Sequence, residues 1–182
     1  MADQDLAALW DEHCRYEFET RDVDATMATM VAEPYVNHVP TMTGGVGHDQ
    51  LKRFYKYHFI GVNPPDFRLT PISRTVGVDR LVDEFVMHFT HTTEIDWMLP
   101  GVPPTGREVH VAGVAIVQFD GERLVHEHIY WDQASVLAQI GMLDPAGLPV
   151  AGAEAARKVA DRTLPSNALM QTAWRKSDGK PV

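Results

Sequence analysis

Apolar residues in the first sixty positions recur every three or four residues, which is the period of a helix. Residues 4–20 and about 47–60 are therefore predicted to be helices. A shorter helix is expected to begin after Asp22, a good N-cap, and to end before Pro34. Residues 35–39 fit a short strand. Pro64 and Pro65 end the helix predicted over about 47–60, because proline lacks the amide donor that a helix needs.

The middle of the chain changes to the composition of β-strands. Residues 67–77, 81–94, 107–119 and 123–132 are rich in Val, Ile, Phe and Thr, and Gly and Asp residues at short connections mark hairpin turns. A last helix is predicted after residue 132. Helices followed by an antiparallel sheet predict an α+β fold with the helices on one face of the sheet. A strongly curved sheet covered in this way encloses a conical pocket suited to a ligand.

Composition and charge narrow the possible partners. The 182 residues suffice for one domain with an extension, and a formal net charge of -9 disfavours nucleic acid and anionic membranes. Cys14 is the one cysteine, so no internal disulfide can form. No signal-peptide pattern and no apolar run long enough for a membrane span occur, so a cytoplasmic protein is expected. Phosphate-loop, dinucleotide and Cys-x-x-Cys motifs are absent from the sequence, so nucleotide cofactors and structural zinc are not expected.

The end of the last predicted strand carries the most suggestive chemistry. Strand alternation places His126, His128, Tyr130 and Asp132 on one face. If that face is concave, the Asp132 carboxylate lies in an apolar cavity, where burial raises its pKa and suits it to proton transfer. Asp132 is equally well placed to cap the following helix. Both interpretations remain open from the spacing alone.

Several short stretches follow one family pattern in order and spacing over about residues 5–143: Asn37-His38, the run 63–66, Thr90-His91-Thr92, the run 103–107, Trp131-Asp132 and the run 139–141. With them the chain resembles the SnoaL-like (polyketide-cyclase-like) branch of the nuclear-transport-factor-2-like superfamily. The resemblance implies a cone-shaped fold, usually dimeric, without a cofactor. It also implies an acid/base aspartate at Asp132, with His91 and His38 as polar pocket residues.

The remaining residues, 144–182, are predicted to be an extension to a domain spanning 1–143, packed on that domain or on a partner subunit. This tail is similar to the C-terminal part of SnoaL-like proteins described as carboxymethylenebutenolidases. The chain itself lacks the Gly-x-Cys/Ser-x-Gly nucleophile motif of such hydrolases.

These observations lead to an enzyme hypothesis with two alternatives. We expect a homodimer that performs acid/base chemistry on a small apolar carbonyl compound, with Asp132 as the proton acceptor and His91 and His38 assisting. A non-catalytic binding or dimerisation module is the first alternative. A metal enzyme that uses His126 and His128, with His110 or His88 as a further ligand, is the second. The residues expected to line the pocket are His58, Trp97, Met98, His128, Tyr130, Tyr55 and Tyr57.

Overall fold

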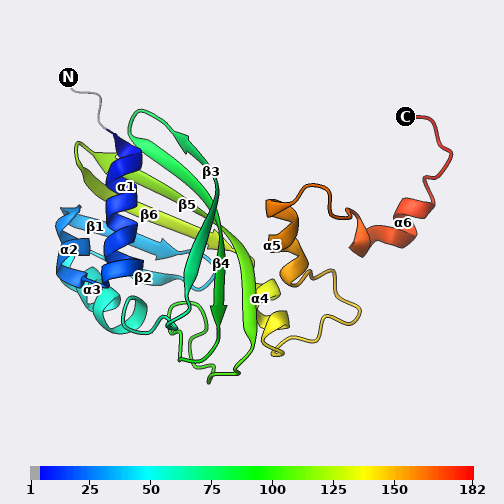
Figure 1. Ribbon diagram of the computed structural model, residues 1–182, viewed down its shortest axis with the longest axis horizontal. Helices are drawn as coiled ribbons and strands as arrows, with labels where there is room; N and C mark the ends of the chain where they lie inside the picture. Colours follow the sequence, from blue (N-terminus) through cyan, green and yellow to red (C-terminus); the bar gives the residue numbers. More distant parts are fainter. Residues whose placement is uncertain (1–4) are drawn as a thin grey trace.

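Three N-terminal helices lie across the concave face of a curved six-stranded sheet (Figure 1). The computed structural model describes residues 5–182. The helices are α1 (Leu6–Cys14), α2 (Val23–Ala28) and α3 (His48–Phe54). The strands are β1 (Met30–His38), β2 (Thr43–Val46), β3 (Arg68–Val76), β4 (Arg80–Thr90), β5 (Glu108–Asp120) and β6 (Arg123–Trp131). This arrangement is the predicted α+β cone.

The strand order in the sheet is β2-β1-β6-β5-β4-β3. Neighbouring strands are antiparallel except β1 and β6, which pair in parallel. The four long strands predicted from composition are therefore confirmed. Strand β2 was not predicted, because Gly44 and Gly45 are residues that strands usually lack. The parallel pair was not predicted, because it joins segments almost one hundred residues apart and leaves no local pattern.

The predicted helix before Pro34 is shorter than expected. Helix α2 ends at Ala28, and β1 already begins at Met30, which pairs with Leu124 of β6. The amide of Leu124 also donates to the carbonyl of Thr29. Pairing with a distant strand thus overrides the local helical pattern of this segment.

Helices α1 and α3 each continue into a wider, π-helical turn. These turns are η1 (Arg15–Thr20) and η2 (Tyr55–Phe59), and the amide of Ile60 donates across five residues to the carbonyl of Tyr55. The predicted helical spans are confirmed within the described residues; position 4 lies outside them. Single π-turns inside helices are often found at functional sites, because they re-aim side chains.

Two further helices pack on the other side of the sheet from α1. Helix α4 (Gln133–Gln139) is tied to β5 by Gln139, whose side chain bonds both the amide and the carbonyl of His110. Helix α5 (Ala153–Ala160) also packs against β5. Beyond it, η3 (Ala168–Met170) and α6 (Gln171–Arg175) extend away from the body (Figure 1). None of the described helices has the length and apolar character that a membrane span requires.

Candidate functional site

A cavity lies between the N-terminal helices and the concave face of the sheet. Its free volume is about 30 Å³, which is room for one or two water molecules. Four of the side chains around it are ionisable: Glu17, His38, Tyr55 and Glu127. The others are mostly aromatic: Trp10, Phe18, Phe59, Phe67, Phe85, Trp97, Val36, Leu69, Met87, Ala115 and Ile129. A ligand of several atoms enters only if aromatic side chains move apart.

A buried charged cluster forms one wall of the cavity, with His13 of α1 at its centre. The Thr29 hydroxyl donates to the carbonyl of Thr26, so His13 Nδ1 must be the donor in its 2.6 Å bond to Thr29 Oγ1. His13 Nε2 lies 3.1 Å from Glu17 Oε1 and 3.2 Å from Glu127 Oε1. With protons on both ring nitrogens, His13 is an imidazolium cation between two carboxylates.

The electrostatics agree with this assignment. Burial alone lowers the pKa of His13, but the charges of Glu17 and Glu127 outweigh burial and raise the pKa to about 10. Burial also raises the pKa of Glu17, against the opposing effect of the His13 charge. Tyr55, whose pKa burial raises well above its usual range, donates its hydroxyl proton to Glu127 Oε1 at 3.2 Å. The wall therefore presents two carboxylates that share the His13 Nε2 donor, and Glu127 also accepts from Tyr55.

His38 of β1 stands on the aromatic part of the lining. Its ring centre lies 4.6 Å from that of Trp97, and its Nδ1 atom is buried without a hydrogen-bond partner. Burial lowers the pKa of His38 to about 3, so the imidazole is neutral. Val36 pairs with Glu127 and His38 with Ile129, so His38 and Glu127 point to the same face with about 8 Å between their Cα atoms. A neutral imidazole and the carboxylate pair thus border one space.

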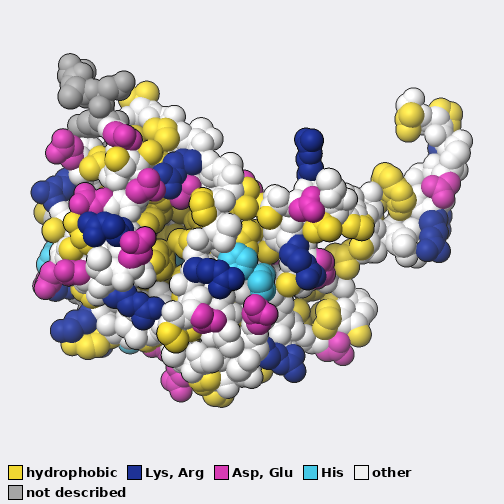
Figure 2. All heavy atoms as spheres, in the orientation of Figure 1, with side chains coloured by type: hydrophobic (Ala, Val, Ile, Leu, Met, Phe, Trp, Pro, Cys, Tyr) yellow, Lys and Arg dark blue, Asp and Glu magenta, His cyan; other side chains and the backbone are white. Residues whose placement is uncertain are grey.

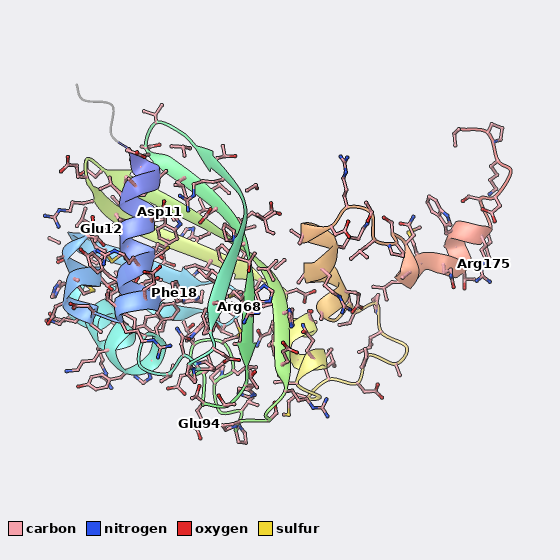
Figure 3. The ribbon with its side chains drawn as sticks, in the orientation of Figure 1. Asp11, Glu12, Phe18, Arg68, Glu94 and Arg175 are labelled. Atoms are coloured by element: carbon pink, nitrogen blue, oxygen red, sulfur yellow. The ribbon has the colours of Figure 1, made fainter. Side chains whose placement is uncertain are left out.

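Phe18 separates the cavity from a groove on the outer surface. The groove, of about 430 Å³, has Phe18, Phe67, Leu69 and Phe85 in common with the cavity lining. Figure 3 shows Phe18 at the lower end of the α1 helix and Arg68 on β3, two residues that line this groove. Phe18 is partly exposed and stacks on Phe67 at 5.6 Å. Movement of the Phe18 ring would connect the cavity with solvent.

Asp132 does not face the cavity. Its side chain is exposed and accepts a 3.0 Å hydrogen bond from the amide of Ser135, at the start of α4. The predicted orientation is wrong, and the N-cap interpretation is confirmed. The whole alternation is reversed relative to the prediction: Glu127 and Ile129 point inward, whereas His128 and Tyr130 lie on the outer face and do not line the cavity.

Three other predicted lining residues are correctly placed: His38, Tyr55 and Trp97. Trp97 is fixed by its indole N–H, which donates to Asn63 Oδ1 at 2.9 Å. Its neighbour Met98 is fully buried but belongs to the core outside the lining.

The remaining predicted residues lie away from the cavity. His91 is buried at the end of β4, where it accepts a hydrogen bond from the amide of Thr105. His58 is partly exposed and bonds Asp96 at 2.9 Å. Tyr57 is 58% exposed. These three positions were expected to surround a ligand, but none of them lines the cavity.

The proposed metal ligands do not converge either. His126 and His128 stack on the outer face with ring centres 4.6 Å apart, and His88 bonds His110 elsewhere on the sheet. Within residues 5–182, one group brings three ligand atoms within 4.8 Å of one another: the cluster of His13, Glu17 and Glu127. A metal ion there would replace the His13 Nε2 proton, with Thr29 orienting the ring through Nδ1. In the present geometry that proton satisfies both carboxylates.

The cluster of His13, Glu17 and Glu127 was not predicted from the sequence. A signal was present: Trp10, His13 and Glu17 are spaced by three and four along an otherwise apolar helix face. Charged residues are rarely buried without a partner. A histidine and a glutamate on that face therefore indicate a buried pair.

Comparisons with known proteins agree with the geometry. Residues 6–127 match the SnoaL-like domain, a region that ends before Asp132. An NTF2-like protein of unknown function from Burkholderia pseudomallei aligns at 20% identity and a TM-score of 0.56 over 74% of this chain and 95% of its own. A proposed polyketide cyclase from Acidithiobacillus ferrooxidans aligns at 20% identity and a TM-score of 0.60, over 79% of this chain and 99% of its own. AclR from Streptomyces galilaeus, a proposed hydroxylase, aligns at 18% identity and a TM-score of 0.58, over 76% of this chain and 96% of its own.

At these identities the structural matches show the fold alone. No curated protein matches the chain. The expected closeness to proteins described as carboxymethylenebutenolidases is not supported by any comparison. The domain match covers well over half of the sequence, and the solved structures have the same curved sheet architecture. The chain therefore belongs to the SnoaL-like domain family and has the NTF2-like cone fold.

Proposed function

We propose that the protein is an enzyme that moves a proton at a carbon next to a carbonyl group of a small, largely apolar compound, without a cofactor. The observation that carries the proposal is the carboxylate pair of Glu17 and Glu127, buried at the wall of an aromatic cavity and held by His13. The fold, shared with proteins proposed to be a polyketide cyclase and a hydroxylase, supports a role on such a ligand.

In the proposed reaction, one carboxylate of the pair accepts the proton from the carbon next to the carbonyl. The C–H electron pair becomes the new C=C bond, and the carbonyl π electrons move onto oxygen. The other carboxylate keeps its bond to the His13 cation, so the wall retains a counter-charge. Where a C=C bond is conjugated with the enolate, the carboxylic acid returns the proton to the far carbon of the dienolate, which is isomerisation. Where the enolate carbon instead attacks a second carbonyl carbon, the alkoxide formed there takes the proton from the carboxylic acid, which is cyclisation.

His38 would stabilise the enolate oxygen. A neutral imidazole is a suitable donor, because it offers an N–H without giving up a proton to solvent at neutral pH. In this role His38 keeps the function expected from the sequence, whereas the proton-transfer role expected of Asp132 passes to the carboxylate pair.

The test is hydrogen–deuterium exchange, followed by NMR, next to the carbonyl of a panel of cyclic ketones and β-diketones in D₂O. We expect Glu17→Gln and Glu127→Gln each to slow enzyme-dependent exchange by about 100-fold or more. Glu94→Gln is the matched control, because Glu94 is exposed on a loop at the far end of the body (Figure 3).

Asp132→Asn distinguishes the two carboxylate assignments. Exchange that is lost in Asp132→Asn but retained in Glu17→Gln and Glu127→Gln would overturn the proposal. Exchange indistinguishable from solvent for the unmodified protein over the whole panel would also count against it.

A further inference from the structure

The C-terminal segment 161–182, called the arm below, leaves large apolar side chains in solvent. Leu169 is 60% exposed, Met170 48% and Trp174 53%. Every hydrogen bond that the arm makes stays within the arm or reaches α5, such as the 2.6 Å bond from Lys158 to the carbonyl of Leu164. Figure 2 shows the arm standing clear of the body, with hydrophobic and basic side chains along it. The arm thus has an apolar surface that its own chain does not cover.

The outer face of the sheet has a matching uncovered surface. Strand pairing places Val82 beside Ile116, Ile116 beside His128, and Val114 beside Tyr130. The ring of Tyr35 packs on His128 at 5.4 Å. We call this surface the outer patch: Tyr35, Val82, Val114, Ile116, His128 and Tyr130. It is made largely of β-branched and aromatic side chains, which pack well when a second layer covers a sheet.

Helix α5 already covers the half of the outer face that lies away from the outer patch. Val86, which pairs with Ala112 on the outer side of β4 and β5, is only 3% exposed, and Ala156 of α5 is 1% exposed. Helix α5 therefore provides a second layer for one half of the face. The arm follows α5 directly in the chain, yet none of the residues 5–182 forms such a layer over the other half.

Charge favours contact between the arm and a chain like its own. The arm carries four basic and two acidic residues, whereas residues 1–160 carry 12 basic and 23 acidic residues. A basic, apolar segment is thus attached to an acidic body. Its 22 residues reach at most about 70 Å when extended, against roughly 30 Å for the width of a six-stranded sheet. The arm is long enough to cross the sheet of a neighbouring molecule.

We propose that the arm of one copy packs across the outer patch of a second copy, and that the second copy does the same in return. A two-fold pair is the simplest closed arrangement that uses both arms and both patches. The apolar residues of the arm and of the outer patch are then buried together. This inference concerns assembly and does not depend on the chemistry proposed for the cavity.

The first test is sedimentation velocity of the full chain across the micromolar range. We expect a dimer. The triple variant Leu169→Ser/Met170→Ser/Trp174→Ser should weaken it by about 100-fold or more, since central apolar anchors carry most of an interface. Ile116→Glu should do the same from the other side. The matched control is Val78→Ser, which changes a fully exposed apolar residue in the β3–β4 turn. Circular dichroism checks that each variant is folded.

The second test locates the arm. In a Cys14→Ser background, a preparation carrying Trp174→Cys is mixed with one carrying Tyr130→Cys, and disulfide-linked pairs are expected on mild oxidation. A monomeric full chain at all concentrations, or a dimer that the arm variant leaves unchanged, would overturn the proposal. So would a disulfide within one chain of the monomer when both cysteines are placed in the same molecule, because the arm would then fold back on its own body.

Discussion

Replacement of Glu127 by glutamine should change how the stability of the protein depends on pH. In the native chain the folded pKa of His13, about 10, lies above its ordinary value of 6.5. The stabilisation from His13 is therefore complete below pH 6.5 and is lost as the pH rises toward 10. The slope over this range is at most about 1.4 kcal/mol per pH unit. Glutamine has nearly the same shape as glutamate but removes one of the two charges that face Nε2.

The size of the change follows from the two bonds at Nε2. They are similar in length, 3.1 Å to Glu17 and 3.2 Å to Glu127, so each carboxylate holds a comparable share of the proton. A hydrogen bond to a charged group contributes about 1.5–3 kcal/mol. Losing one of these two hydrogen bonds should lower the pKa of His13 from about 10 to between about 8 and 9. At pH 6 the free energy of unfolding should fall by the same 1.5–3 kcal/mol, and the deficit should shrink as the pH approaches 10.

Urea unfolding at a series of pH values from 6 to 10 measures both effects. Glu94→Gln removes the same charge from an exposed position and should follow the native curve. Glu17→Gln should behave like Glu127→Gln. A native protein whose stability is flat between pH 6.5 and 10, or a Glu127→Gln curve parallel to the native one, would refute the assignment of His13 as a buried cation.

Four further changes test other features of the structure. His38→Phe should flatten the acid branch of the stability curve: the folded pKa of His38, about 3, lies below 6.5, so native stability falls as the pH drops through this range, which urea unfolding would show. Phe18→Ala should open the cavity mouth, raising the association rate of an apolar fluorescent probe in stopped flow, at a stability cost of about 2 kcal/mol. Gly113→Ala places a Cβ 2.7 Å from the ring of Phe85 and should cost about 1–3 kcal/mol in thermal unfolding while reducing probe binding. Asp132→Ala removes the N-cap of α4 and should cost about 1 kcal/mol, with ketone exchange retained; lost exchange at native stability would contradict the capping role.

The sequence predicted the elements well and the inward face of β6 poorly. Periodicity is a local property, so the long strands and most of the helices could be read from neighbouring residues. Alternation along β6 divides the strand into two sets but does not say which set faces the core. The set with Glu127 also contains the apolar residues Ile129 and Trp131, and these two residues indicated the buried side better than the polar residues did.

The buried position of Glu127 could not have been derived from its own strand. A glutamate at the core is stable only with a cationic partner, and that partner, His13, lies 114 positions earlier in the chain. The family pattern drew attention to Asp132 instead, whose strong preference as an N-cap explains its place at a strand–helix junction. His38 was identified through the family resemblance, and pairing of β1 with β6 places it at the cavity.

The parallel pairing of β1 with β6 also constrains how the protein is made. The ribosome delivers α1, with His13 and Glu17, long before it delivers β6, so these charged side chains cannot reach their buried arrangement until residue 131 has emerged. Contacts between such distant segments slow folding, because a long loop must close before they form. During synthesis the apolar face of α1 therefore stays exposed until β6 has been made. Over that time the nascent chain has to be shielded from aggregation.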